Sequence, residues 1–443
     1  MAAPERSFAA RLRRLAASDR GLFLCALLIR LGLTFLYSRR HVTVTGLELG
    51  TLADNLLAGR GFVWEFYGST VPRTSFFPPF YPAFIALLKL IFGASGWVMA
   101  MQVVQALVSA ATAVVTRRLA ACVFGAGPER APVSRPSAVS DVNQQNMALA
   151  AGYAVALWPP LIVYSAAAYS VTWEALLVPW IALLLFTAGR SRRFADAARA
   201  GVGYGILAYA LPAFLGSILF LPAAFRAMGA RWTRAIGLGF VTLAAALLVV
   251  LPWTIRNARI HHRFIPVATN IGFNYLGGQN AYARPHTNIL CAYDDLRWKV
   301  IDKQALETMN EADFDQLLLK EGLAFARAEP WLTVRRSAER LLYYWWGSPA
   351  IRRYNPEQGV VNMALMSAVL PVFLIGLAAS FAVRERYAIL YAVFLWQSLF
   401  YMNFAIRGRY ALVSHPLLLV VAVAGAAALG AWLAGARRRG ERA

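Results

Sequence analysis

The chain has 443 residues, of which 59% are hydrophobic and 15% are charged, and its formal net charge at pH 7 is +22. Apolar runs long enough to cross a bilayer recur along its whole length, which excludes a soluble enzyme built around one large core. Most basic residues stand in short loops between these runs. We therefore attribute the positive charge to membrane topology, with anionic lipid headgroups as partners, and expect no nucleic-acid binding.

The first predicted span covers residues 21 to 37 and follows a basic stretch, which places the amino terminus on the cytoplasmic side. A later span, 97 to 120, ends in two arginines and a polar loop, so its carboxyl end also faces the cytoplasm. Residues 38 to 96 must then lie outside, and the apolar piece 78 to 93 is predicted to be a half-inserted or interfacial helix. If this piece spanned the membrane instead, the orientation of everything after it would be reversed.

The remaining spans leave arginine-rich loops inside, and the count reaches ten passes, two of them short. These spans are predicted at 147–165, 172–188, 199–225 (a hairpin of two short helices broken at Pro212), 234–255, 362–382, 387–404 and 410–434. Residues 256 to 345 are the only long stretch that could fold in water, since they hold ten of the 22 acidic residues and carry apolar residues at helical spacing. We expect an all-α polytopic membrane protein with a first outer loop of interfacial helices and a small helical outer subdomain.

The cysteines predict neither a metal knuckle nor a disulfide framework, because Cys25, Cys122 and Cys291 lie far apart and form no CxxC pair. The segment before residue 20 is basic and amphipathic, and we expect the span that follows it to be retained rather than cleaved as a signal peptide.

Acidic residues are scarce on the outer side of the amino-terminal half, where only Glu48, Asp54, Glu65 and Glu174 are expected. Glu174 lies at the outer end of a span and has no basic residue near it in sequence. An ionisable group at membrane depth costs about 2.5 to 3.5 kcal/mol on insertion scales, so Glu174 is a functional candidate. The alternative is an interfacial glutamate that reaches water or caps its helix. For Glu48, composition alone favours a solvated amphipathic helix that lies on the membrane surface.

Five segments then occur in an order and spacing that resemble one family. They are ELGTLADNLLAGRGF (48–62), PPFYPAFIALL (78–88), LPWTIRNARIHHRFIPVATNIGFNYLGGQN (251–280), AEPWLTVRRSAERLLYYWW (328–346) and RGRYALVSHPLLL (407–419). Together they resemble the bacterial members of the dolichyl-phosphate-mannose protein mannosyltransferase family, glycosyltransferase family 39 of the GT-C superfamily.

The resemblance implies a GT-C type transmembrane helix bundle in a bacterial inner membrane, with its active site on the outer, periplasmic face. It implies a polyprenyl-phosphate sugar donor, an acceptor lipid, glycan or protein, and inverting transfer to an acceptor hydroxyl. Glu48 matches the carboxylate with which these enzymes deprotonate or orient the acceptor, because a hydroxyl is a poor nucleophile until a base takes its proton. Glu174 matches a second acid that relatives hold in the following outer loop.

The leaving lipid phosphate needs positive charge near it, for which Arg256 and Arg409 are the first candidates, with Arg407 and Lys89 as further ones. Further predicted substrate contacts are Tyr410, Tyr81 and Asn280 in the family-like segments, and Arg30 within the first span, which could instead pair with an acid inside the bundle. Many relatives carry Asp or an Asp–Glu pair where this chain has the lone Glu48, so we predict neither a bound metal nor another cofactor.

The predicted organisation is an amino-terminal transmembrane module (1–255, with the catalytic outer loop 38–96), an outer helical segment (256–345) and carboxy-terminal transmembrane helices (346–443). Two alternatives stay open: a polytopic transporter or lipid flippase, and a surface-glycan polymerase or ligase with a lipid-linked donor. A transporter usually shows paired repeats with broken helices, and only one broken hairpin is present, without a convincing second copy.

Overall fold

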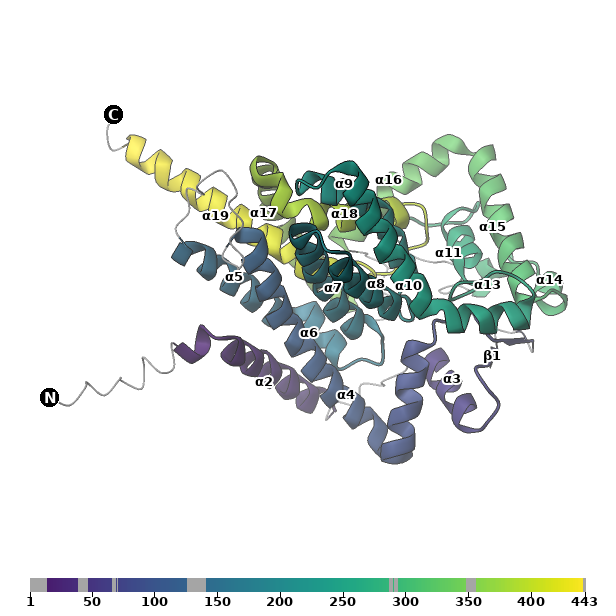
Figure 1. Ribbon diagram of the computed structural model, residues 1–443. Coiled ribbons are helices and arrows are strands. Elements are labelled where there is room, and N and C mark those ends of the chain that lie inside the picture. Colours follow the sequence, from purple (N-terminus) through teal and green to yellow (C-terminus); the bar gives the residue numbers. More distant parts are fainter. Residues whose placement is uncertain are drawn as a thin grey trace.

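A computed structural model describes residues 14–38, 47–65, 69, 71–125, 141–286, 290, 294–347 and 356–440. Within these residues the chain is almost entirely helical, and its strands form one antiparallel pair of two residues each, β1 (Trp64–Glu65) and β2 (Pro72–Arg73). The all-α fold class predicted from the sequence is therefore confirmed. The first described helix begins and the last one ends at the same end of the molecule, on the left in Figure 1.

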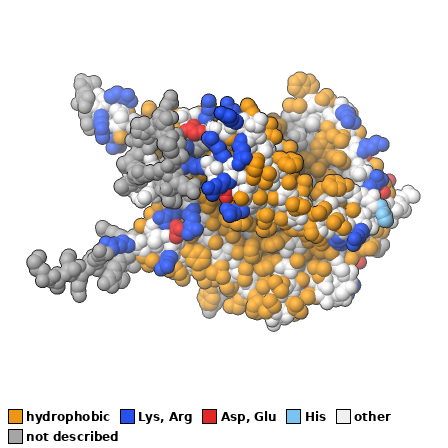
Figure 2. Space-filling view, viewed as in Figure 1, with side chains coloured by type: hydrophobic (Ala, Val, Ile, Leu, Met, Phe, Trp, Pro, Cys, Tyr) orange, Lys and Arg blue, Asp and Glu red, His pale blue; other side chains and the backbone are white. Residues whose placement is uncertain are grey.

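The membrane bundle consists of the helices that follow the apolar runs. They are α2 (Asp19–Ser38), α4 (Phe80–Phe124), α5 (Asp141–Ala156), α6 (Pro159–Ser165), α7 (Val171–Ser191), α8 (Phe194–Ala208), η1 (Pro212–Phe220), α9 (Leu221–Ala227), α10 (Trp232–His261), α17 (Pro356–Ser380), η3 (Phe381–Val383), α18 (Arg384–Tyr401), η4 (Leu412–Ser414) and α19 (His415–Gly440). Lysine and arginine side chains gather at the end where α2 begins and α19 ends, which the sequence predicts to be cytoplasmic (Figure 2).

Five helical segments of the described chain are long and apolar enough to cross a membrane, or six if the bent pair α5–α6 is taken as one span. The chain is thus an integral membrane protein. The number is lower than the ten passes predicted from the sequence. The difference comes from the short elements α8, η1 and α9, from α2, which is not among these segments, and from α17 and α18, which form one segment, Val361–Tyr401.

Two breaks in the bundle follow from local sequence. Gly93 interrupts α4 with φ 69° and ψ −177°, a backbone conformation that favours glycine, and it separates residues 80–92 from the longer apolar part of the helix. The predicted boundary of this helix at residue 93 is confirmed, while its depth in the membrane stays a prediction. The second break, between α5 and α6, bends the chain by 49° where Pro159 and Pro160 begin a new helix.

Arg30 stabilises the carboxyl end of α5 at this second break. Its side chain is fully buried and donates hydrogen bonds to the carbonyl oxygens of Ala156 (2.9 Å) and Val155 (3.3 Å) and to Ser109 Oγ (2.6 Å). The two carbonyls lie at the carboxyl end of a helix, where carbonyl oxygens carry partial negative charge that a cation stabilises. Arg30 is therefore bonded to backbone and serine oxygens here, and the acid that the sequence offered as an alternative partner is not among these contacts.

The remaining helices lie at the opposite end of the molecule from the start of α2 and the end of α19, on the right in Figure 1. They are α3 (Leu47–Leu57), α11 (Ile271–Gly278), α13 (Asp294–Arg297), α14 (Lys303–Thr308), α15 (Glu311–Ala328) and α16 (Pro330–Trp346). One hydrophobic cluster unites Leu52 and Trp64 of the first outer loop with Phe273 and Phe314 of the central outer segment. The two outer segments therefore share a core, while the domain boundaries at 255 and 345 stay a prediction.

Candidate functional site

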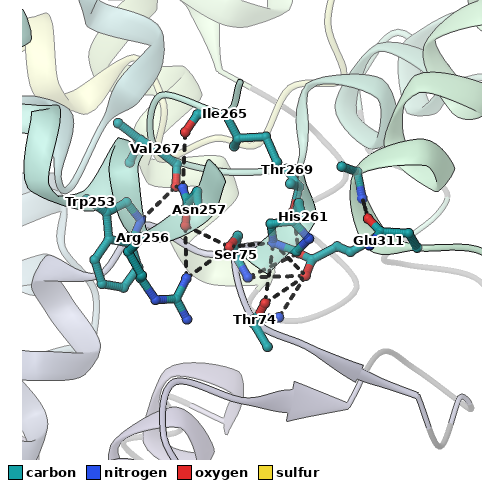
Figure 3. A network of polar contacts seen from close by, with 12 residues as sticks. Thr74, Ser75, Trp253, Arg256, Asn257, His261, Ile265, Val267, Thr269 and Glu311 are labelled. Atoms are coloured by element: carbon teal, nitrogen blue, oxygen red, sulfur yellow. Dashed lines mark hydrogen bonds and ion pairs between the residues drawn. The ribbon is translucent and has the colours of Figure 1, made fainter. Parts of the chain in front are cut away.

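A buried polar network joins the first outer loop to α10 and α15 (Figure 3). The Glu311 carboxylate accepts hydrogen bonds from the backbone N–H groups of Thr74 (2.7 Å) and Ser75 (3.2 Å) and from the Thr269 hydroxyl. Glu311 is buried, and a buried carboxylate is stable when such donors surround it. We call this network the outer clamp; its members are Thr74, Ser75, Arg256, Asn257, His261, Thr269 and Glu311.

The outer clamp contains a serine, a histidine and an acid, but their geometry is not that of a nucleophilic triad. Ser75 Oγ lies 2.9 Å from His261 Nε2, and the Glu311 carboxylate lies 3.8 Å from the same nitrogen. A proton relay needs the nucleophile on one ring nitrogen and the acid on the other. The arrangement therefore connects chain segments and does not activate Ser75.

Arg256, a predicted phosphate contact, is part of this clamp. Its guanidinium donates to Ser75 Oγ (3.1 Å) and Asn257 Oδ1 (2.9 Å) and lies 4.4 Å from the Trp253 ring centre. These contacts position the outer end of α10 against the first outer loop.

Two charged residues lie buried beside the clamp. Arg73 is 2% exposed, and burial lowers its pKa, although the Glu311 charge opposes this change. Asp315 accepts a hydrogen bond from the Phe273 N–H (3.1 Å) at the start of α11, and burial raises its pKa to about 6. Arg73 belongs to the packing between the first outer loop and α15, where it lies 5.2 Å from the Phe314 ring centre, and Asp315 connects α15 to α11.

A second polar cluster forms around Glu174, in the first turn of α7. The carboxylate is 5% exposed, is hydrogen-bonded to the Ser170 side chain and interacts electrostatically with Arg409. The Arg409 guanidinium lies 4.6 Å from the ring centre of Tyr169 and 5.5 Å from that of Tyr410. Two loops far apart in the sequence thus bring a buried acid, a cation and two phenol rings together.

The second outer loop, residues 166–170 between α6 and α7, is fixed by two buried glutamines of α4. The side-chain amide of Gln105 donates to the carbonyl oxygens of Ser165 (3.2 Å) and Ala167 (2.8 Å), and its oxygen accepts from the Tyr81 hydroxyl (2.9 Å). Gln102 donates to the Ala166 carbonyl (3.1 Å). Three successive carbonyls are therefore bound by one helix, directly before Tyr169 and Glu174.

These two glutamines and Tyr169 were not predicted as site residues. Gln102 and Gln105 stand three positions apart inside an apolar span, so a polar pair on one helix face was visible in the sequence. Nothing in the sequence indicated which loop they bind.

Glu48 lies in the first turn of α3 and is partly buried. The apolar face of α3 packs through Ala53 in a cluster that also contains Tyr81 of α4, Ala168 of the second outer loop and, at its edge, Trp173. Ala168 and Trp173 are the sequence neighbours of Tyr169 and Glu174. Helix α3 therefore lies on the same side of the molecule as the polar cluster around Glu174.

Asp54, the other acid of α3, forms an ion pair with Lys89 (2.7 Å), whose ammonium lies 5.0 Å from the Trp97 ring centre. Lys89 therefore connects α3 to α4.

Asn280 lies in the turn after α11, and its side chain is used within that turn. Its amide donates to the Leu276 carbonyl (2.6 Å), and its oxygen accepts from the Tyr282 N–H (2.8 Å). Among the predicted substrate contacts, Arg409 and Tyr410 lie in the polar cluster around Glu174. Tyr81 is connected to the loop before Glu174 through Gln105. The structure places Arg256, Asn280 and Arg30 in other contacts.

No group of three or more histidine, cysteine or acidic side chains that could hold a metal ion occurs among the described residues.

Comparison with known proteins gives a fold relationship. Neither protein-family models nor curated proteins give a match. Two solved structures of the Archaeoglobus fulgidus oligosaccharyltransferase are similar. The complex with Zn and sulfate has a TM-score of 0.51 and 14% identity, covering 93% of this chain and 49% of that one. The apo form has a TM-score of 0.52 and 13% identity, and the match covers 96% of this chain and 52% of that one.

The chain thus spans about half the length of these structures. At this identity the likeness shows the fold alone. It confirms that the helical membrane bundle is arranged as in these oligosaccharyltransferase structures, whereas membership of the GT-C superfamily and of glycosyltransferase family 39 stays a prediction.

Proposed function

We propose that this chain is a membrane glycosyltransferase that moves a sugar from a polyprenyl-phosphate-linked donor to a hydroxyl acceptor on the outer face of the membrane. The observation that carries the proposal is the cluster of Glu174, Arg409, Tyr169 and Tyr410 on a fold similar to that of oligosaccharyltransferases. The last loop, which holds Arg409, also contacts the outer segment, because the Ala405 N–H donates to the Asn274 carbonyl (2.9 Å).

Glu48 serves as the base in this proposal. Its carboxylate takes the proton of the acceptor hydroxyl while the hydroxyl oxygen bonds to the anomeric carbon. The bond between that carbon and the donor phosphate breaks on the opposite side, so the lipid phosphate leaves and the configuration inverts. Glu174 is the second carboxylate, which orients Arg409 or the acceptor.

Arg409 binds the lipid phosphate as its negative charge develops. A guanidinium is suited to this role, because it stays charged and donates two parallel hydrogen bonds to phosphate oxygens. The Tyr169 ring limits the positions that the guanidinium adopts, so less entropy is lost on binding. Tyr410 follows Arg409 and stacks on Tyr401 at a centroid distance of 5.3 Å, which fixes this end of the loop.

The acceptor in this proposal is a lipid, a glycan or a protein, and the enzyme is a multi-pass protein of a bacterial inner membrane with a periplasmic active site. The basic end of the bundle supports this orientation, because the proposed site lies on the side of the outer helices.

The test is sugar transfer by the purified chain in lipid nanodiscs from radiolabelled polyprenyl-phosphate mannose, glucose and arabinose into total membrane acceptors. Glu48→Gln keeps the side-chain size and removes the base, so we expect transfer to fall about 10²- to 10⁴-fold. Asp54→Asn is the matched control, because Asp54 lies on the same helix in an ion pair with Lys89; it is expected to retain most activity.

Equal transfer by wild type and Glu48→Gln would remove Glu48 from the mechanism and move the base to Glu174. Absence of transfer from every donor, with folded protein, would contradict the proposal and favour a transporter or flippase.

A further inference from the structure

Helix α16 has an apolar stripe on the side that faces away from the protein. Trp331 is 84% exposed, Val334 57%, Leu342 66% and Trp346 42%. Together with the exposed Ala338, these residues follow one another at spacings of three or four, so they lie on a single face of the helix. A water-soluble helix would place this face against its core.

The opposite face of α16 is buried and polar. Ser337 and Arg340 are 3% and 1% exposed, and the Arg340 guanidinium donates to the carbonyl oxygens of Gly278 (2.7 Å) and Met402 (3.0 Å). The buried Tyr344 hydroxyl bonds to Gln397 and to the Tyr410 carbonyl (3.2 Å). The polar side of the helix is thus directed to the protein and the apolar side outward, the reverse of the usual pattern.

The stripe continues onto a membrane-facing surface. At its carboxyl end, Trp346 Nε1 donates to Ser367 Oγ of α17 (2.7 Å), within a segment of spanning length and hydropathy. Leu374 of α17 is 59% exposed on that segment. Figure 1 shows α16 running from the far end of α15 back to the bundle.

The composition of the stripe fits lipid better than a protein partner. Tryptophan stands at both of its ends, as in the aromatic belts of membrane interfaces. The charged neighbours Arg335 and Glu339 pair with each other (2.9 Å) at the edge of the stripe, and an arginine there reaches the headgroups while its stem lies along apolar surface.

We propose that α16 lies in the outer leaflet of the membrane, with this stripe against lipid acyl chains. The outer segment is then anchored in the bilayer along α16, next to the loop that carries Arg409 and Tyr410. The inference does not depend on the proposed glycosyl transfer, since it rests on the two faces of one helix.

The test uses spin labels on single cysteines at Val334 and Leu342, in the full chain with Cys25, Cys122 and Cys291 replaced by serine and reconstituted in nanodiscs. Collision with oxygen, which concentrates in lipid, is compared with collision with a water-soluble nickel chelate. Leu374 of α17 is the lipid-side control, and Lys320, exposed on α15, is the water-side control. We expect Val334 and Leu342 to match Leu374, with oxygen collision several-fold above nickel collision.

If the collision rates at Val334 and Leu342 match those at Lys320, the stripe faces water and the proposal is wrong. If the labels at Val334 and Leu342 collide rarely with both reagents and each nanodisc holds two chains, a second copy of the chain covers the stripe and the proposal is wrong. A photoactivatable acyl chain provides a measurement on the unlabelled protein. Adducts on residues 330–346 at a yield similar to that on α17 support the proposal, and adducts on α17 alone contradict it.

Discussion

The guanidinium carbon of Arg409 lies 4.6 Å from the centre of the Tyr169 ring. This contact joins the loop before α7 to the loop after α18, next to the buried Glu174 carboxylate. A cation over an aromatic face is attracted to the ring, most strongly where water is excluded. Tyr169 is therefore expected to set the position of Arg409, the cation that we propose binds the donor phosphate.

Replacing Tyr169 with leucine is expected to weaken donor binding. A cation–π contact contributes about 0.5 to 2 kcal/mol, so the donor KM should rise about 2- to 30-fold. Tyr169→Phe keeps the ring and should remain near wild type. The measurement is initial rate against donor concentration. A fall in kcat with an unchanged KM in Tyr169→Leu would assign the ring to the chemical step instead.

Gln105→Leu is expected to loosen the second outer loop. The substitution removes hydrogen bonds to Tyr81, Ser165 and Ala167 and leaves buried polar groups unpaired, at about 1 to 3 kcal/mol each. Hydrogen exchange at residues 166–170 should accelerate and the thermal midpoint should fall. Gln316→Leu on the exposed surface of α15 is the control, and unchanged exchange in Gln105→Leu would show that other contacts order the loop.

Glu311→Gln is expected to separate the first outer loop from α15. The carboxylate accepts bonds from Thr74, Ser75 and Thr269, and an amide there directs an N–H group at other donors. We expect a destabilisation of about 3 kcal/mol and faster proteolysis within residues 71–78.

Asp313→Asn removes an exposed ion pair with Arg263 (2.8 Å), which contributes about 0 to 1 kcal/mol. It is the matched control for Glu311→Gln. Equal stability of the two variants would mean that the outer clamp does not connect these segments.

Asp315 should make stability depend on pH. Burial raises its pKa from 3.8 to about 6 in the folded state, so between these values the folded chain holds a proton that the unfolded chain has lost. Stability from this group is therefore full below pH 4 and falls by about 3 kcal/mol as pH rises to 6. Asp315→Asn should remove this component. Thermal midpoints of both proteins between pH 4 and 7 check it, and parallel curves would contradict it.

Part of the site could be predicted from the sequence. An acid within an apolar run is costly and so indicates a functional role, which made Glu174 a candidate. Arg409 and Tyr410 were candidates because they stand in a segment that resembles the family. The predicted roles of Arg256, Asn280 and Arg30 had less to support them, because a basic or amide side chain at a helix end serves a carbonyl as readily as a phosphate. Their hydrogen bonds in the structure are of that kind.

The sequence by itself determined the helical membrane bundle and its breaks, because hydropathy, prolines and glycines act on the local chain. The tertiary structure decided which distant groups meet: Arg409 with Tyr169, Gln105 with the second outer loop, and Glu311 with the first. It also decided which face of α16 turns inward. A helical period shows that a stripe exists, but only the packed chain shows whether protein or lipid covers it.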